Sequence, residues 1–213
     1  MAEELGLPYP KNSTCVKPSG TLSKVMDTTE GMHKPLGKYI FNNVVFGRHD
    51  PLVNKLIEAN YRIISHPDPN QAEESVLITL PTSYEDVPFD KVNGTEVNLE
   101  SAVDQLERYK LLQTSWTQQN TSVTISYSPD EVEDIIDWLL QNWDVYVGVS
   151  FLYRNDPTKT AKDLGYLYLP QEVVTKEAYD AYVSQLKEID FSGTDSFDEI
   201  DNQDCATGAC PIK

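Results

Sequence analysis

Apolar positions recur at helical spacing in several segments of the chain. The clearest segment opens with Ser128-Pro129-Asp130-Glu131, which has the pattern of a capping box with proline at the first helical position. One face of the helix that follows collects Val132, Ile135, Ile136, Leu139 and Leu140. Similar spacing predicts helices over 99–117 and 179–189, and Asp50-Pro51 is typical of the start of a helix that closes near Asn60. A short helix could also open over 22–26.

Strand patterns lie between these helices. In 122–127 the apolar side chains alternate with threonine and serine, as in a half-buried strand. The run 145–151 is almost continuously apolar, which is typical of a strand covered on both faces. Two more strands are predicted over 13–17 and 75–80. The order strand, helix, strand therefore predicts an α/β fold in which 122–127 and 145–151 form a parallel pair.

Composition and charge narrow the function classes. The 213 residues are 39% hydrophobic, which is enough for a core in one large domain or two small ones. Acidic residues number 34 against 17 basic ones, a formal net charge of −17 that disfavours nucleic acid and anionic membranes as partners. No apolar run approaches the length of a membrane span, and the first residues are acidic where a signal peptide would be basic. We expect a cytoplasmic protein.

The C-terminal end differs in composition from the rest. Residues 190–204 include six acidic and no basic side chains, with few large apolar groups. Such a segment cannot recover its ordering entropy by burying surface, so we expect a flexible acidic tether. The predicted organisation is a folded part over 1–189 and a flexible tail over 190–213.

Cys205 and Cys210 lie at the end of that tether with four small residues between them. A short, glycine-containing segment can bring two cysteines within disulfide distance, and cytosolic disulfides are usually transient and catalytic. A redox-active dithiol is therefore the favoured interpretation; the alternatives are a metal knuckle and an incidental pair. Metal is disfavoured because the other candidate ligands are widely scattered: Cys15, His33, His49 and His66.

The turn Pro18-Ser19-Gly20-Thr21-Leu22-Ser23 is a candidate phosphate site. Its glycine lets a ligand approach the backbone, and its hydroxyls and helix-start amides can bind an anion, with Lys17 adding positive charge. The alternative is a turn that merely caps a helix.

The remaining cysteine, the histidines and two tryptophans are expected to have structural rather than chemical roles. Cys15 falls in a predicted strand and is expected to be a small buried apolar residue. The three histidines are expected on the surface or in loops, and Trp138 and Trp143 fit helix packing.

Four stretches, taken in order, resemble the C-terminal part of adenosylcobalamin-dependent (class II) ribonucleotide reductases, especially the monomeric ribonucleoside-triphosphate reductases. They are Ser13-Thr14-Cys15-Val16-Lys17-Pro18-Ser19-Gly20-Thr21-Leu22-Ser23, Gly31-Met32-His33-Lys34-Pro35-Leu36, Trp138-Leu139-Leu140-Gln141-Asn142-Trp143-Asp144 with Gly148-Val149-Ser150-Phe151-Leu152, and the segment from Cys205 to Lys213. The last, Cys-x-x-x-x-Cys-Pro-Ile-Lys, is the most specific of them.

The resemblance implies a ten-stranded α/β barrel, of which this chain would be the C-terminal part. In these enzymes adenosylcobalamin generates a thiyl radical inside the barrel, the radical takes the 3′ hydrogen of the nucleotide, and the 2′ hydroxyl leaves as water. Two barrel cysteines supply the electrons and become a disulfide, which a mobile tail dithiol reduces. By position, Cys205 and Cys210 would be the tail pair that thioredoxin recharges. Pro18, Ser19, Gly20, Thr21 and Ser23 would bind the substrate phosphate.

Several family features are missing from this sequence. The radical cysteine of the family lies in an Asn-x-Cys-x-Glu loop, which the sequence lacks, and it has no second cysteine pair and no N-terminal allosteric region. We therefore expect the rest of the barrel to come either from a second, N-terminal polypeptide of a split gene or from the remainder of a longer chain of which this sequence is a fragment. After Tyr39-Ile40 the family usually has basic residues where this chain has Asn42 and Asn43. The rival interpretation is a stand-alone dithiol shuttle that meets thioredoxin-like partners and closes its own core.

Overall fold

The computed structural model describes residues 2–9, 12–20, 23, 26, 28–156 and 159–189. It divides the chain into two compact units, each built from two separate stretches. The larger unit draws on 1–43 and 80–181, and the smaller unit on 44–79 and 182–213. Strands β1 (Tyr39–Gly47) and β3 (Ser75–Ser83) each run from one unit into the other.

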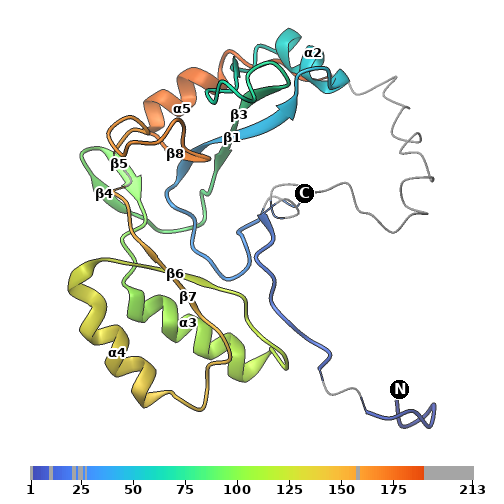
Figure 1. The fold of residues 1–213 in the computed structure, drawn as a ribbon, viewed down its shortest axis with the longest axis vertical. Coiled ribbons are helices and arrows are strands. Elements are labelled where there is room, and N and C mark those ends of the chain that lie inside the picture. Colours follow the sequence, from blue (N-terminus) through green and yellow to red (C-terminus); the bar gives the residue numbers. More distant parts are fainter. Residues whose placement is uncertain are drawn as a thin grey trace. The chain divides into compact units, whose positions relative to one another are not determined.

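Within the larger unit, two parallel strands and two helices form one layered arrangement (Figure 1). Strand β6 (Thr124–Tyr127) pairs in parallel with β7 (Ser150–Tyr153), and Thr124 lies opposite Ser150. The connection is a 3-10 turn over Pro129–Glu131 followed by α4 (Val132–Gln141). Helix α3 (Ala102–Ser115) packs on β6 and α4. The predicted parallel α/β pair is confirmed.

The core of this arrangement consists of apolar side chains from α3, β6 and α4, joined by one residue from the loop that precedes β1. They are Met32, Ala102, Leu106, Tyr109, Val123, Ile125, Ile135 and Trp138. The predicted capping box is present, because the Glu131 carboxylate accepts a hydrogen bond from the Ser128 amide at 2.7 Å. Helix α3 begins after Ser101, whose hydroxyl accepts from the Asp104 amide at 3.1 Å.

The expectation for 145–151 is wrong in two respects. The chain turns after α4 and becomes a strand only at Ser150, because Asn142 ends the helix and Val145 bonds back to its carbonyl at 2.9 Å. Among the described residues, the side chains of β7 are also only partly covered, since Phe151, Leu152 and Tyr153 are 38%, 63% and 55% exposed. Trp143 is exposed as well, so only Trp138 of the two tryptophans packs into the core.

The predicted strand over 13–17 reduces to a single parallel bridge between Val16 and Thr121. Polar side chains stop it from extending: the Ser13 hydroxyl donates to the Gln118 amide oxygen at 2.6 Å, and the Thr14 hydroxyl donates to the Trp116 carbonyl at 2.6 Å. Cys15 is exposed rather than buried.

Further strands that the sequence did not predict belong to two separate sheets, a four-stranded one with the order β2-β3-β1-β8, where β2 is Ile63–Ser65, and a two-stranded one of β4 and β5. Strand β8 (Gln171–Val173) pairs antiparallel with β1, and β4 (Asp90–Val92) with β5 (Thr95–Val97). Helix α5 (Lys176–Val183) is shorter than predicted, and its Tyr179 ring lies against Tyr39 at a centroid distance of 5.1 Å.

The smaller unit contains α2 (Pro51–Glu58), β2 (Ile63–Ser65) and the first part of β3, which pairs antiparallel with β2. The predicted start of α2 is confirmed, because the Asp50 side chain accepts from the Leu52 amide at 2.8 Å. His66 is buried in this unit rather than on the surface. None of the helices in the described ranges has the length and apolar character needed to cross a membrane.

Candidate functional site

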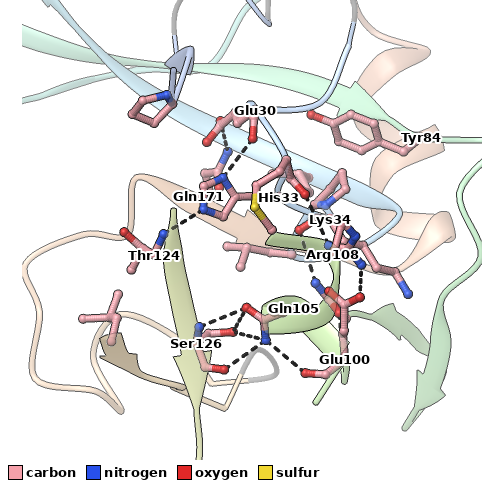
Figure 2. A pocket seen from close by; sticks show the side chains of 17 residues that line it. Glu30, His33, Lys34, Tyr84, Glu100, Gln105, Arg108, Thr124, Ser126 and Gln171 are labelled. Carbon is pink, nitrogen blue, oxygen red and sulfur yellow. Dashed lines mark hydrogen bonds and ion pairs between the residues drawn. The ribbon is translucent and has the colours of Figure 1, made fainter. Parts of the chain in front are cut away.

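A cavity of about 370 Å³ opens within the larger unit, where the loop before β1 meets α3, β6 and β8 (Figure 2). The loop residues Met32 to Leu36 line one side, and Pro18, from the predicted phosphate turn, lies at the same cavity. Two of the stretches that carry the family resemblance, 13–23 and 31–36, therefore meet here.

Gly31 brings these two stretches into contact. Its φ of +55° is a conformation that glycine adopts without strain, and a Cβ atom there would lie 2.8 Å from the Lys17 carbonyl oxygen. The carbonyl belongs to backbone and cannot move aside as a flexible side chain would. Glycine at position 31 therefore permits the close packing of the loop on the start of the predicted phosphate turn.

His33 connects the loop to the parallel strands. The Thr124 amide donates to His33 Nε2 at 3.1 Å, and His33 Nδ1 lies 2.9 Å from the Glu30 carbonyl oxygen. A backbone amide can only donate and a carbonyl can only accept, so the partners assign a neutral ring with its proton on Nδ1. The histidine is thus a bridge and not merely a loop residue.

Arg108 of α3 holds the same loop from the side of the helix. Its guanidinium pairs with the Glu100 carboxylate and donates to the Met32 carbonyl at 3.2 Å. Burial lowers the pKa of Arg108, but a guanidinium stays charged at any ordinary pH. Because Glu100 balances this charge, the arginine acts here as a fixed donor to the backbone rather than as an anion receptor.

Gln105 joins α3 to β6 at the floor of the cavity (Figure 2). Its amide oxygen accepts from the Ser126 amide at 3.0 Å, and its amide nitrogen donates to the Ser126 carbonyl at 3.0 Å. The side chain is buried, so both of its polar atoms need these partners.

Replacing Gln105 by alanine is expected to loosen β6, because the Ser126 amide would lose its acceptor. A buried amide without an acceptor destabilises the folded state by about 2 kcal/mol. Native-state hydrogen exchange of the Ser126 amide should therefore show an opening free energy that is lower by about the same amount. Leu111→Ala, at an exposed position of the same helix, serves as the control and should change it by less than about 0.5 kcal/mol. Equal exchange in both variants would show that Gln105 does not secure the strand.

The predicted phosphate turn is described at Pro18, Ser19, Gly20 and Ser23, whereas Thr21 and Leu22 lie outside the described residues. The Ser23 amide donates to the Ser19 carbonyl at 3.2 Å, as in a first helical turn. Ser23 is 2% exposed and its hydroxyl donates to the Gly20 carbonyl at 3.3 Å. A Cβ at Gly20 would meet no atom of the described residues within 4 Å, so none of them fills the space beside the backbone there.

The predicted dithiol, Cys205 and Cys210, and the acidic segment that carries it also lie outside the described residues. No motif in the sequence had pointed to Gln105, to Arg108 or to a role for His33. A usable signal existed for Gln105: it stands three residues after Ala102 and four before Tyr109, on the buried face of α3. A polar residue on an apolar helix face must find partners, and here it finds β6.

The fold places the chain among proteins built like class II ribonucleotide reductases. A crystal structure of a B12-dependent (class II) ribonucleotide reductase superposes with a TM-score of 0.72 and 24% identity over 88% of this chain and 24% of that chain. No family model matches the sequence.

Curated proteins give the more specific likeness. The adenosylcobalamin-dependent ribonucleoside-triphosphate reductases of Levilactobacillus brevis and Lactobacillus gasseri are each 30% identical over all of this chain. The enzyme of the same name from Lactobacillus leichmannii is 29% identical over 94% of it. The chain spans 28%, 28% and 26% of the lengths of these relatives. The chain is related to these reductases along its length, as its motifs indicate.

Proposed function

We propose that the chain forms the C-terminal segment of an adenosylcobalamin-dependent ribonucleoside-triphosphate reductase, which converts ribonucleotides to 2′-deoxyribonucleotides. The observation that carries this proposal is the similarity over the full chain to curated enzymes of that name. A separate N-terminal polypeptide, or the remainder of a longer one, would supply the rest of the barrel and the radical loop.

The exposed face of β7 supports a barrel segment over a stand-alone dithiol shuttle. Strands β6 and β7 form a two-stranded sheet in the described part of the chain, and three consecutive β7 side chains, Phe151 to Tyr153, are exposed. A module that works alone would be expected to cover such a surface, whereas a barrel segment leaves it for its neighbours.

The cofactor would be bound by the complete enzyme, where it supplies the radical that starts the reduction. Around Asn42 and Asn43 the residues of this chain do not fit a cofactor contact. The Asn42 amide donates to the Leu80 carbonyl and the Thr82 hydroxyl, and the Asn43 amide donates to the Leu169 carbonyl and the Glu172 carboxylate. Both side chains join β1 to neighbouring backbone, so we assign them a structural role.

The turn that contains Pro18, Ser19, Gly20, Thr21 and Ser23 is proposed to bind the substrate triphosphate. The space beside Gly20 among the described residues and the bond from the Ser23 amide to the Ser19 carbonyl support this role, because amides at a helix start attract anions. Ser23 would contribute through its place in the turn, since its hydroxyl already bonds to Gly20.

Replacing Gly20 by valine is expected to raise the KM for the ribonucleoside triphosphate by about tenfold or more, because the branched side chain would fill the space in which the phosphate approaches the backbone. The measurement is steady-state kinetics of the complete reductase. Gly20→Ala is the matched control, with a smaller side chain and a smaller expected increase. A Cβ atom at position 20 meets no described atom within 4 Å, so the Gly20→Ala control separates the effect of a side chain as such from that of the branched valine. An unchanged KM in Gly20→Val would indicate that the turn only caps a helix and does not bind the phosphate.

The tail dithiol, Cys205 and Cys210, is proposed to pass electrons from thioredoxin to the disulfide formed in the barrel. The acidic composition of 190–204 supports this role, since a flexible tether gives the dithiol a high local concentration at the barrel and also lets it reach a partner.

A further inference from the structure

We infer that His33 is a positioning residue that holds the proposed phosphate turn in place relative to strand β6. The inference rests on the proposed function of that turn. It concerns a side chain that no motif of the sequence analysis assigned to substrate binding.

The two ring nitrogens of His33 bond to groups on different elements (Figure 2). Nδ1 donates to the Glu30 carbonyl within the loop, and Nε2 accepts from the Thr124 amide 91 residues away. The first bond fixes the ring against its own loop. The second joins that loop to the first residue of β6, so the ring transmits the position of the strand to the loop.

The loop in turn contacts the phosphate turn directly. Gly31 leaves no room for a Cβ beside the Lys17 carbonyl, and Pro18 Cα would lie 3.6 Å from such an atom. On its other side the loop is held by Arg108 through the Met32 carbonyl. A displacement of residues 31–33 would therefore move the backbone that leads into the turn from Pro18 to Ser23. It would either push against that backbone or remove a contact that supports it.

Two hydrogen bonds of Val16 also help to fix the position of the phosphate turn relative to β6. Val16 donates to the Asn120 carbonyl at 3.2 Å and accepts from the Ser122 amide at 2.9 Å, just before β6. The segment that leads into the phosphate turn is thus hydrogen-bonded through Val16 to the residues just before β6. The loop that contacts the turn is hydrogen-bonded to β6 through His33. The Val16 bonds reach residues 120 and 122 and the His33 bond reaches Thr124, so the turn and its supporting loop are held to one continuous stretch of chain at two places.

His33 is suited to positioning rather than to core stability. It is only half-buried, and the core cluster beside it contains Met32 but not His33. Met32 anchors the loop to that core in either case. Removal of the Nε2 bond should therefore shift the loop without unfolding the unit, and the effect should fall on substrate binding more than on turnover.

The test compares two substitutions in the complete reductase. A glutamine side chain can place an acceptor near the Nε2 position, whereas asparagine is too short to reach Thr124 and keeps a donor only near Nδ1. His33→Asn is expected to raise the KM for the ribonucleoside triphosphate about fivefold with kcat within about twofold, and His33→Gln to restore most of the affinity. His49→Gln, at an exposed histidine, is the matched control and should behave as the wild type.

Hydrogen exchange of the Thr124 amide gives a second measurement that does not depend on activity. We expect slow exchange in the wild type and in His33→Gln and faster exchange in His33→Asn. Equal KM in both His33 variants, or a joint loss of kcat and thermal stability in both, would overturn the inference. If Gly20→Val leaves KM unchanged while Thr124 exchange follows the expected order, the bridge holds but the phosphate role of the turn fails.

Discussion

Replacing Cys205 or Cys210 by serine is expected to leave the first turnover of the complete reductase intact and to abolish the later turnovers that thioredoxin drives. On the proposed mechanism the barrel pair would still be reduced at the start, so one nucleotide per active site would be converted. The disulfide that results can be reopened only by a dithiol that reaches it, and a single remaining tail thiol would form a mixed disulfide without a partner to resolve it.

The measurement is a single-turnover burst beside steady-state rates with two reductants. Dithiothreitol diffuses into the site and should restore much of the rate in the serine variants, whereas thioredoxin should not. Cys15→Ser is the matched control: this exposed thiol lies outside the tail, and its loss should leave thioredoxin-driven turnover unchanged. Loss of the burst would show that the tail cysteines react with the nucleotide, and full thioredoxin-driven activity without them would remove the tail from the mechanism.

Purified residues 1–213 are expected to be partly aggregated or loosely packed and to become ordered when the rest of the barrel is added. The reason is the apolar surface that the chain leaves open. Phe151, Leu152 and Tyr153 of β7 are exposed, and so are Ile136 and Leu140 on the outer side of α4. Large exposed apolar patches are rare on proteins that work alone and promote association.

Two observations on the isolated chain decide this prediction. A hydrophobic dye should bind strongly and the thermal transition should be broad, and both signals should change toward those of a compact protein on mixing with the complementary polypeptide. A sharp, cooperative transition without dye binding would contradict it and would favour the stand-alone shuttle.

Local signals in the sequence were sufficient for the elements around the parallel pair. The capping box at Ser128, the proline at position 129 and the alternation in 122–127 each describe their own neighbourhood, and α4 and β6 form as these signals predict. The continuous apolar run after α4 was misleading. Tyr146 and Val149 of this run pack partly buried against the core, whereas Phe151 at its end is exposed. Sequence alone does not separate such a mixed segment from a strand covered on both faces.

The features that could not be predicted from the sequence depend on contacts between residues far apart in the chain. Strand β1 contains Asn42 and Asn43, which disfavour a strand, yet their amides bond to backbone on β3 and near β8. The contact of Gly31 with Lys17 and the bond of His33 to Thr124 likewise depend on residues brought together by the fold. The motifs located the two stretches of the site, but only the structure shows that they touch.

The most direct test of the central claim is to measure deoxyribonucleotide formation by the remainder of the reductase with and without this chain. The polypeptide that carries the Asn-x-Cys-x-Glu loop is combined with residues 1–213, adenosylcobalamin, thioredoxin and a ribonucleoside triphosphate. We expect 2′-deoxyribonucleoside triphosphate to form over many turnovers only when the cofactor and both parts of the protein are present. Equal product formation without residues 1–213, or none in the complete mixture, would contradict the assignment of this chain as the C-terminal segment of the reductase.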